Sequence, residues 1–325
     1  GAQGTFVPPT LIELESFDEL EKEVFGPVLH VVRYNRNKLG ALVEQINASG
    51  YGLTLGVHTR IDETIAQVTG SAHVGNLYVN RNMVGAVVGV QPFGGAGLSG
   101  TGPKAGGPMY LYRLLASRPE DALLTTLNRQ DAHYPVDSQL KSVLEQPLTA
   151  LRAWAIKRPA LQALCDRYGE LAQAGTQRVL PGPTGERNSW TLVPRERGLC
   201  LADNEEDALI QRAAATAAGC EVLWPEDGLQ RGLAKQLPTA VSERIRFAGR
   251  EQIASAQFDA VIYHGDSDQL RELCQQVAAR DGAIVSVQGF ARGETNLLLE
   301  RLYHERSLSV NTAAAGGNAS LMTIG

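Results

Sequence analysis

The chain has 325 residues, of which 43% are hydrophobic and 20% charged, a composition that excludes a disordered, collagen-like or coiled-coil protein. Lys and Arg total 30 and Asp and Glu total 35, so the formal charge of −5 provides no overall field to bind nucleic acid or an anionic membrane. No apolar run approaches the roughly 20 residues that cross a bilayer. The four cysteines (Cys165, Cys200, Cys220 and Cys274) form no C-x-x-C pair, which argues against a disulfide scaffold or a metal site and favours a reducing, cytoplasmic compartment.

The first 110 residues alternate between expected strands and helices. Each expected strand is a short apolar run, and each expected helix places its apolar residues on one face. The expected strands are residues 5–14, 28–34, 53–58 and 76–80, and the expected helices are residues 16–22, 37–49 and 61–72. This alternation predicts an α/β layer architecture.

A glycine-rich segment, residues 83–108, follows these elements. It contains nine glycines and three prolines, so it cannot form long regular structure. It is also too apolar for a flexible linker, which would be rich in serine and charged residues. We therefore expect an ordered loop that brings backbone N–H groups close to a ligand.

Residues 116–180 are expected to form a helical connector, and residues 181–325 a second α/β unit. In the connector, helices are expected over residues 118–132 and 136–157, and Pro159 suits the first position of a third helix. The second unit again alternates strands and helices, as a doubly wound parallel sheet does. Its expected strands are residues 198–202, 220–224, 245–248, 259–264, 283–287 and 308–311, and its expected helices are residues 205–218, 228–236, 267–280 and 295–304.

Two short segments echo each other. Residues 76–80 read NLYVN and residues 307–311 read SLSVN, and small residues and glycines follow each. A strand that closes on Val-Asn is short enough to arise by chance. Internal duplication and coincidence therefore both remain open.

Two stretches resemble the aldehyde dehydrogenase superfamily. Residues 23–27 read EVFGP, the E-x-F-G-P signature, and residues 75–100 carry the N-x-x-V-N-R core and the Q-P-F-G-G-x-G-x-S-G ending of the family's closing segment. The glycine-rich segment is similar to the glutamate-semialdehyde dehydrogenase branch. The chain's ending, SLSVNTAAAGGNASLMTIG, resembles the C-terminus of the long proline utilization A family, bifunctional or trifunctional bacterial enzymes of proline catabolism.

The resemblance covers the whole chain and implies an α/β fold. Residues 1–115 would be the C-terminal part of an aldehyde dehydrogenase catalytic domain. Residues 181–325 would be a Rossmann-like, non-catalytic domain that is itself similar to aldehyde dehydrogenases and ends in a glycine-rich tail.

The resemblance assigns three residues to the cofactor NAD. Glu23 matches the glutamate that holds the nicotinamide ribose, because a carboxylate can accept hydrogen bonds from both ribose hydroxyls. Phe25 matches the residue that flanks the nicotinamide ring, and Leu53 matches a further contact to that ring. The alternatives are a solvated acidic residue for Glu23 and ordinary core packing for Phe25 and Leu53.

Three further residues match the family's substrate site. Gly85 and Ala86 match the loop that anchors the α-carboxylate and amine of the substrate, where bare backbone N–H groups suit a carboxylate. Phe93 matches an aromatic wall beside the substrate's aliphatic chain, and loop packing is its alternative role.

We expect no catalytic residue and no metal ligand on this chain. In the family a cysteine thiolate attacks the aldehyde, hydride passes to NAD⁺, and a glutamate helps water to release the acid. Both residues precede E-x-F-G-P in the family, but only 22 residues precede Glu23 here, and the sequence begins at Gly1 without a Met or a signal peptide. The four cysteines, all in expected helices or strands, are expected to be structural.

The second unit is expected to have lost the family's chemistry. Residues 260–265 resemble the strand before the cofactor-binding turn, but Asp266 and Asp268 would repel a phosphate there. Residues 285–289 resemble the stretch that carries the base glutamate and would place Ser286 at that position, where a neutral hydroxyl cannot replace a carboxylate.

The resemblance therefore implies part of an NAD-dependent L-glutamate γ-semialdehyde (pyrroline-5-carboxylate) dehydrogenase that is inactive by itself. The alternative is a structural, lid or interaction module that supports substrate channelling and assembly. FAD would belong only to the parent's proline dehydrogenase domain. The expected partners are the substrate, the rest of the parent polypeptide and a second copy of it, and the resemblance also allows a parent attached at the inner membrane.

Overall fold

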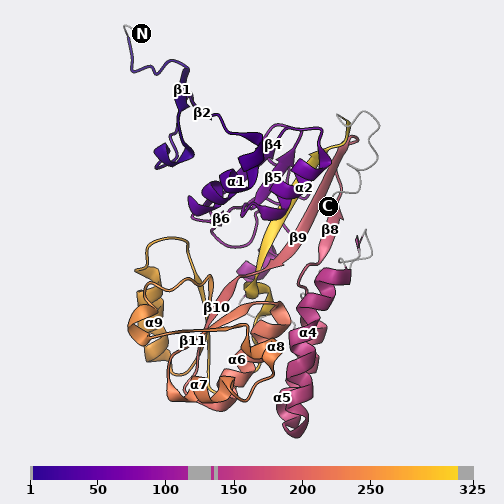
Figure 1. The fold of residues 1–325 in the computed structure, drawn as a ribbon, viewed down its shortest axis with the longest axis vertical. Helices are drawn as coiled ribbons and strands as arrows, with labels where there is room; N and C mark the ends of the chain where they lie inside the picture. Colours follow the sequence, from indigo (N-terminus) through magenta and orange to yellow (C-terminus); the bar gives the residue numbers. More distant parts are fainter. Residues whose placement is uncertain (1–2, 116–132, 135–137, 314–325) are drawn as a thin grey trace.

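The computed structural model describes residues 3–115, 133–134 and 138–313. Figure 1 shows an upper lobe formed by the N-terminal elements and a lower lobe formed by β10, β11 and the helices around them, with the long strand β9 running from one lobe to the other. The helix expected over residues 118–132 and the tail after residue 313 lie outside the described residues.

The lower lobe is built on a parallel sheet. Within the described ranges its five strands lie in the order β12-β11-β10-β13-β14. Their bounds are Arg197–Leu201 (β10), Glu221–Pro225 (β11), Ile245–Ala248 (β12), Ala260–His264 (β13) and Ser286–Phe290 (β14). The order reverses direction between β10 and β13, as the expected doubly wound sheet requires.

Helices cover both faces of this sheet. The alanine-rich helix α6 (Glu205–Ala218) is buried along nearly its whole length, in one core with α4 (Ser138–Trp154) and α5 (Pro159–Leu171). Helix α9 (Ser267–Ala278) contributes Leu273 to a second core, with Leu199, Val261 and Tyr263 of the strands. Two shorter helices are α7 (Gly228–Ala234) and α8 (Thr239–Ser242).

The upper lobe contains a mixed sheet that draws strands from both ends of the chain. Counting described residues only, six strands lie in the order β4-β5-β15-β9-β8-β7. Their bounds are Thr54–Val57 (β4), Asn76–Val79 (β5), His133–Tyr134 (β7), Gln177–Leu180 (β8), Glu186–Pro194 (β9) and Tyr303–Asn311 (β15). Strand β15 pairs parallel with β5 and antiparallel with β9, so the second unit completes the sheet of the first.

The two faces of the mixed sheet differ in chemistry. Because side chains alternate along a strand, Leu77 and Val79 share one face with Leu308 and Val310. Helices α1 (Leu39–Ala48) and α2 (Asp62–Ser71) cover this face through Val43, Ile65 and Val68. The other side, called the polar face below, carries Asn76, Tyr78, Glu186, Asn188, Trp190, Glu305, Ser307 and Ser309.

The remaining elements are short. Strands β1 (Thr10–Leu14) and β2 (Val28–Val32) form a parallel pair near the N-terminus, and β3 (Tyr51–Gly52) pairs with β6 (Ala96–Gly97). Single turns of 3₁₀ helix are η1 (Phe17–Glu19), η2 (Arg36–Lys38), η3 (Tyr110–Leu114), η4 (Ala155–Lys157), η5 (Arg250–Gln252) and η6 (Leu299–Leu302). Among helices in the described ranges, none is long and apolar enough to cross a membrane.

The helix expected over residues 295–304 is wrong. Residues 299–302 make one 3₁₀ turn, and the chain then enters the nine-residue strand β15. Pairing with β5 on one side and β9 on the other satisfies the backbone groups of this segment, so tertiary pairing outweighs a weak helical pattern.

Candidate functional site

The glycine-rich segment lies as an ordered loop against the polar face. Asn76 Nδ2 donates a hydrogen bond to the carbonyl oxygen of Pro92 at 2.9 Å, and Ser307 Oγ donates to the same oxygen at 2.7 Å. The N–H of Gly94 donates to Asn76 Oδ1 at 3.1 Å, and Phe93 and Ala105 exchange two backbone hydrogen bonds. These contacts confirm the expected ordered loop and hold the backbone on both sides of Phe93.

Glycine at position 75 permits this close approach. A Cβ there would lie 2.1 Å from the carbonyl oxygen of Gly94 and 2.9 Å from Gly95 Cα, well inside van der Waals contact. The loop can therefore sit at its observed depth only where β5 begins without a side chain.

Lys104, near the end of the loop, has a buried side chain. Its Nζ donates to Asn76 Oδ1 at 3.0 Å and to the carbonyl oxygen of Gly94, and its side chain is only 2% exposed. Burial lowers the pKa of Lys104 to about 7, and the charge of Glu305 opposes this shift. A neutral amine has two N–H donors, which matches the two acceptors at this position.

Glu305 links the loop to the second unit. Its Oε2 accepts from the Lys104 backbone N–H at 2.6 Å, and its Oε1 accepts from Trp190 Nε1 at 3.1 Å. Burial raises the pKa of the Glu305 carboxyl, while these hydrogen bonds and the Lys104 charge act in the opposite direction.

Glu186 forms a second link between the second unit and the loop. Its carboxylate accepts from Arg81 Nη1 at 2.6 Å, from Gln91 Nε2 at 2.6 Å and from Asn188 Nδ2 at 2.9 Å. The amide oxygen of Gln91 accepts in turn from the backbone N–H of Val87 at 3.2 Å. Glu186 is thus connected to the loop through one buried side chain.

The substrate residues predicted from the sequence lie together on this loop. Gly85, at φ +77°, and Ala86 are exposed, and Phe93 is half-buried. The N–H groups of Gly85 and Ala86 have no hydrogen-bond acceptor within the described residues, whereas the N–H groups of Val84 and Val87 are bound by side chains. This leaves two adjacent free donors between two fixed neighbours.

The predicted cofactor residues lie elsewhere. Glu23 and Phe25 occupy the turn before β2, where the Phe25 ring is 88% exposed and Glu23 is exposed as well. Leu53 lies between β3 and β4 and is 40% exposed. In the described part of the chain no hydrogen bond or ion pair connects these residues with Gly85, Ala86 or Phe93.

Doubly wound sheets bind nucleotides at the carboxyl ends of their strands. In the lower lobe, the chain's own groups lie at this edge. Asp266 Oδ1 accepts from the backbone N–H groups of Asp268 and Gln269 at 3.0 and 2.9 Å, which occupies the N-terminus of α9. His264 Nε2 lies 2.8 Å from the carbonyl oxygen of Glu294, and the Gly293 N–H donates to Asp207 Oδ1 at 2.8 Å. The chain's own side chains and the loop at residues 293–294 therefore occupy the carboxyl end of β10 and β13.

Three of the four cysteines have thiols that burial makes poor nucleophiles. Cys165, Cys200 and Cys220 are buried, and burial raises the pKa of the Cys165 and Cys200 thiols to about 12 and that of Cys220 still further. Thiols at such values are not nucleophiles near neutral pH. Cys274 is exposed. In the portion of the chain that the structure describes, no group of three His, Cys, Asp or Glu residues could hold a metal ion.

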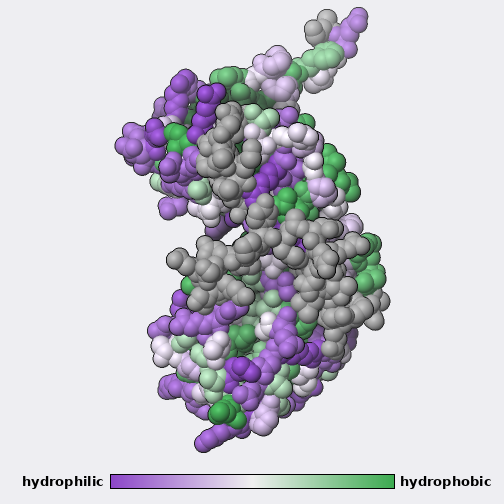
Figure 2. All heavy atoms as spheres, turned by 90° about the vertical axis from the view of Figure 1, so that its right-hand side faces the viewer, coloured by the Kyte–Doolittle hydropathy of each residue, from purple (hydrophilic) through white to green (hydrophobic). Residues whose placement is uncertain are grey.

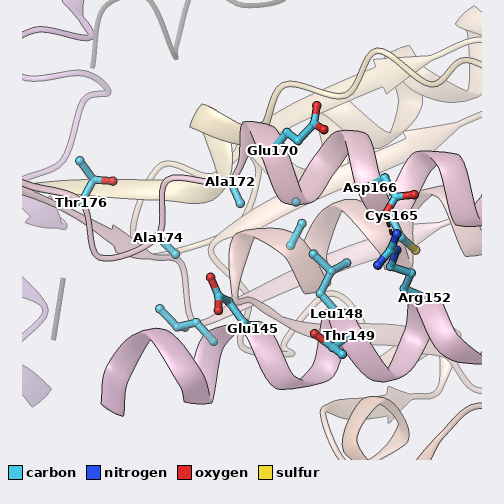
Figure 3. A pocket seen from close by; sticks show the side chains of 13 residues that line it. Glu145, Leu148, Thr149, Arg152, Cys165, Asp166, Glu170, Ala172, Ala174 and Thr176 are labelled. Carbon is cyan, nitrogen blue, oxygen red and sulfur yellow. Dashed lines mark ion pairs between the residues drawn. The ribbon is translucent and has the colours of Figure 1, made fainter. Parts of the chain in front are cut away.

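An open groove of about 890 Å³ lies between α4 and α5 (Figure 3). Its walls combine apolar side chains such as Leu148 with the carboxylates of Glu145 and Glu170, and Arg152 forms an ion pair with Asp166 across it. Among the described residues that line the groove, Cys165 is the one cysteine. None of the six predicted site residues lines the groove.

Comparison with known proteins identifies the upper lobe. Residues 1–118 match the model of the aldehyde dehydrogenase family. Over 110 residues, 33% of this chain, the sequence is 46% identical to 1-pyrroline-5-carboxylate dehydrogenase 1 of Halalkalibacterium halodurans, of which it covers 21%.

The whole chain has longer relatives. Over 322 residues, 99% of this chain, it is 80% identical to the Bifunctional protein PutA of Escherichia coli (strain K12). The chain spans 24% of that relative's length. The solved structure of Proline Utilization A (PutA) from Corynebacterium freiburgense shares the fold, with a TM-score of 0.54 at 20% identity over 93% of this chain and 27% of that one.

The side chains that hold the glycine-rich segment in place were not predicted from the sequence. Asn76, Gln91, Lys104, Glu186, Glu305 and Ser307 belong to this set. A signal was present in S-L-S-V-N, where polar and apolar residues alternate with the period of a strand that has one polar face. The alternation does not show which segment of the chain packs against that polar face.

Proposed function

We propose that this chain supplies the substrate-anchoring part of an NAD-dependent L-glutamate γ-semialdehyde dehydrogenase that works in proline catabolism. The pair of free N–H groups at Gly85 and Ala86 carries the proposal. Two adjacent backbone donors with small side chains suit the α-carboxylate of an amino-acid aldehyde. The family match and the pyrroline-5-carboxylate dehydrogenase relative support the same substrate class.

The residues on this chain would act by orientation. Gly85 and Ala86 would hold the carboxylate end of the substrate, and Phe93 would confine its aliphatic chain so that the aldehyde reaches a nucleophile from elsewhere in the polypeptide. Holding the aldehyde in one place converts part of an encounter into an intramolecular step. No residue of this chain is proposed as nucleophile or base.

The turn at Glu23 and Phe25 fits one end of NAD. The Glu23 carboxylate is exposed and has no partner among the described residues, so it can accept from ribose hydroxyls, and the exposed Phe25 ring can stack on the nicotinamide. NAD, when bound, accepts the hydride that oxidation of the aldehyde releases. No second NAD site is proposed in the lower lobe, because Asp266 and the loop at residues 293–294 fill the corresponding edge.

The exposed surface of the upper lobe fits a chain that continues into further protein. Figure 2 shows hydrophobic side chains exposed on the upper lobe beside hydrophilic ones. Phe6, Leu11, Val84 and Leu111 are each at least 66% exposed. We propose that the preceding part of the same polypeptide covers these side chains.

A structural role for the lower lobe is the second candidate function. Strands β9 and β15 belong to that unit by sequence but lie in the sheet that carries the substrate loop. This placement favours a supporting role. Channelling of an intermediate, a self-associated parent, a flavin in another domain and a cytoplasmic location are further proposals that follow from the family resemblance.

The decisive experiment compares two aldehydes in the full-length polypeptide. NADH formation is measured with L-glutamate γ-semialdehyde and with an unbranched aldehyde of the same chain length that lacks the α-carboxylate and amine. We expect the semialdehyde to have the lower KM by at least about tenfold, because each charge-assisted hydrogen bond to a carboxylate contributes 1.5–3 kcal/mol. Equal KM values would contradict the proposed role of Gly85 and Ala86. The 325-residue chain alone is expected to form no NADH.

A further inference from the structure

The link from Glu186 to the substrate loop has a geometry that packing alone does not require. Glu186 lies at the start of β9, on the polar face, with its side chain 17% exposed. Three donors from different parts of the chain point at its two oxygens: Arg81 and Gln91 at 2.6 Å and Asn188 at 2.9 Å. A carboxylate is the side chain that accepts at both oxygens and donates at neither, so this position requires an acceptor-only group.

Gln91 transmits this contact to the loop. It is 5% exposed, and its amide group is committed at both ends, with Nε2 on Glu186 and Oε1 on the backbone N–H of Val87. The Gln91 N–H also donates to the Val87 carbonyl oxygen at 2.8 Å, which closes a turn. Val87 directly follows Gly85 and Ala86. The position of the two free N–H groups therefore depends on the orientation of the Gln91 amide.

The other end of the loop is held from the same unit. Ser307 of β15 donates to the Pro92 carbonyl oxygen at 2.7 Å, directly before Phe93. Arg81, which binds Glu186, also donates to Ser309 Oγ at 2.8 Å. Both halves of the substrate loop are thus attached to β9 and β15, strands that follow the aldehyde dehydrogenase match by at least 68 residues.

We propose that Glu186 is a positioning residue for aldehyde binding, acting through Gln91 on the backbone at residues 85–87, and that Ser307 has the same role at Phe93. The inference rests on the proposed function, because it assumes that this loop binds the aldehyde. It assigns strands β9 and β15 of the second unit a specific part in substrate affinity and leaves hydride transfer to residues elsewhere.

The test uses Glu186→Gln in the full-length polypeptide. The introduced amide keeps one acceptor oxygen and turns its N–H₂ group toward either Arg81 or the pair Gln91 and Asn188. The three donors then compete for the one remaining oxygen, so the Gln91 amide loses its fixed orientation. We expect KM for the aldehyde to rise about tenfold, the effect of losing one charge-assisted hydrogen bond, while kcat and KM for NAD stay within about twofold. Glu221→Gln is the matched control, because Glu221 is also a half-buried carboxylate that binds two arginines, Arg197 and Arg246, but lies in the lower lobe.

Exchanging the residues at positions 186 and 91 distinguishes a positioning role from a general loss of structure. In the double variant Glu186→Gln with Gln91→Glu, the donor and acceptor exchange places and the link is restored, so we expect KM for the aldehyde to return most of the way. An unchanged KM in Glu186→Gln, a parallel change of kcat and KM for NAD, or a double variant as impaired as the single one would each overturn the proposal.

Two further measurements keep the test independent of folding and of the proposed function. If Glu186→Gln does not fold, Ser307→Ala decides: removal of one hydroxyl is expected to raise KM for the aldehyde about three- to fivefold, and an unchanged value overturns the proposal. Hydrogen exchange of peptides covering residues 84–91 is expected to accelerate in Glu186→Gln and to stay unchanged in Glu221→Gln. Unchanged exchange overturns the positioning role, whereas a wild-type enzyme that does not oxidise glutamate semialdehyde overturns the proposed function and leaves the exchange result valid.

Discussion

Asn76 and Ser307 lie opposite each other in neighbouring parallel strands and donate hydrogen bonds to the same carbonyl oxygen, that of Pro92. They are the first residues of the two segments that echo each other in the sequence, 76–79 and 307–310, which pair residue for residue. The similarity thus has a physical counterpart: each strand supplies alternate apolar residues to the core under α2 and alternate polar residues to the loop. Whether duplication produced it stays open.

The contact between Gly75 and the loop predicts a specific effect of a single methyl group. Gly75→Ala would place Cβ 2.1 Å from the Gly94 carbonyl oxygen, so either β5 or the loop must move. We expect a loss of about 1–3 kcal/mol in the free energy of unfolding, the usual range for overpacking, measured by denaturant titration of the chain.

Gly70→Ala is the control for this change. Gly70 lies in α2 and a Cβ there meets no atom within 4 Å, so alanine is expected to stabilise the chain by about 0.5–1 kcal/mol. A Gly75→Ala variant as stable as the wild type would show that the loop does not rest on β5 at this depth.

Burial of Lys104 predicts a rise in stability above neutral pH. Burial lowers the pKa of Lys104 to about 7, whereas an unfolded lysine titrates near 10.4. Between these values the unfolded chain binds a proton that the folded chain does not, so the free energy of unfolding increases with pH by up to about 1.4 kcal/mol per unit. Denaturant titrations at pH 7, 8 and 9 measure this slope.

Lys104→Met removes the titrating group and is expected to flatten that slope. Lys157→Met is the control, because Lys157 is exposed in η4 and its replacement is expected to leave the slope unchanged. If Lys104→Met and wild type have the same pH dependence, the Lys104 amine is not neutralised on folding.

Local signals predicted much of the lower lobe. Helix α6 matches its predicted bounds because Asn204 caps its first turn and Gly219, at φ +82°, ends it. Strand β12 also matches, and α9 begins as predicted at Ser267, after the Asp266 cap. Caps and glycine ends act within a few residues, so the sequence displays them directly.

The mixed sheet could not be predicted in the same way. Strand β9 was not predicted at all, and only the last four residues of β15 were predicted as a strand, because the pairing of β9 with β15 joins residues more than 100 positions apart. The loop residues Gly85, Ala86 and Phe93 came from a family motif. Their supports, Glu186 and Ser307, lie outside it and become visible only when β9 and β15 are placed in the sheet.

The lowered pKa of Asp259 predicts that the free energy of unfolding decreases in acid. Burial raises the pKa of this carboxyl, but hydrogen bonds from His304 Nε2 at 2.9 Å and from the Arg197 N–H, with the charges of His304 and Arg195, outweigh burial and lower the pKa overall. A lowered folded-state pKa contributes stability above the unfolded value near 3.9, and that stability disappears as the pH falls through the folded value.

Asp259→Asn is therefore expected to destabilise the chain at pH 7, where its amide N–H₂ would face other donors, and to differ less from wild type at pH 3. Thermal unfolding at both pH values measures the difference. Asp281→Asn, at an exposed position after α9, is the control and is expected to track wild type at both. A gap between Asp259→Asn and wild type that stays constant with pH would mean that Asp259 does not carry the acid transition.

Glu23 offers a test of the cofactor end of the proposed site. Glu23 belongs to an acidic run with Glu19 and Glu21, so a solvated surface carboxylate is the competing role. If Glu23 accepts from both ribose hydroxyls, Glu23→Gln in the full-length polypeptide replaces charge-assisted hydrogen bonds by neutral ones. KM for NAD is then expected to rise about tenfold, with KM for the aldehyde unchanged.

Glu21→Gln removes the same charge two residues away and is expected to leave both KM values unchanged. Equal effects of the two substitutions would show that only the local charge matters, and the turn before β2 would then have no specific contact with the ribose.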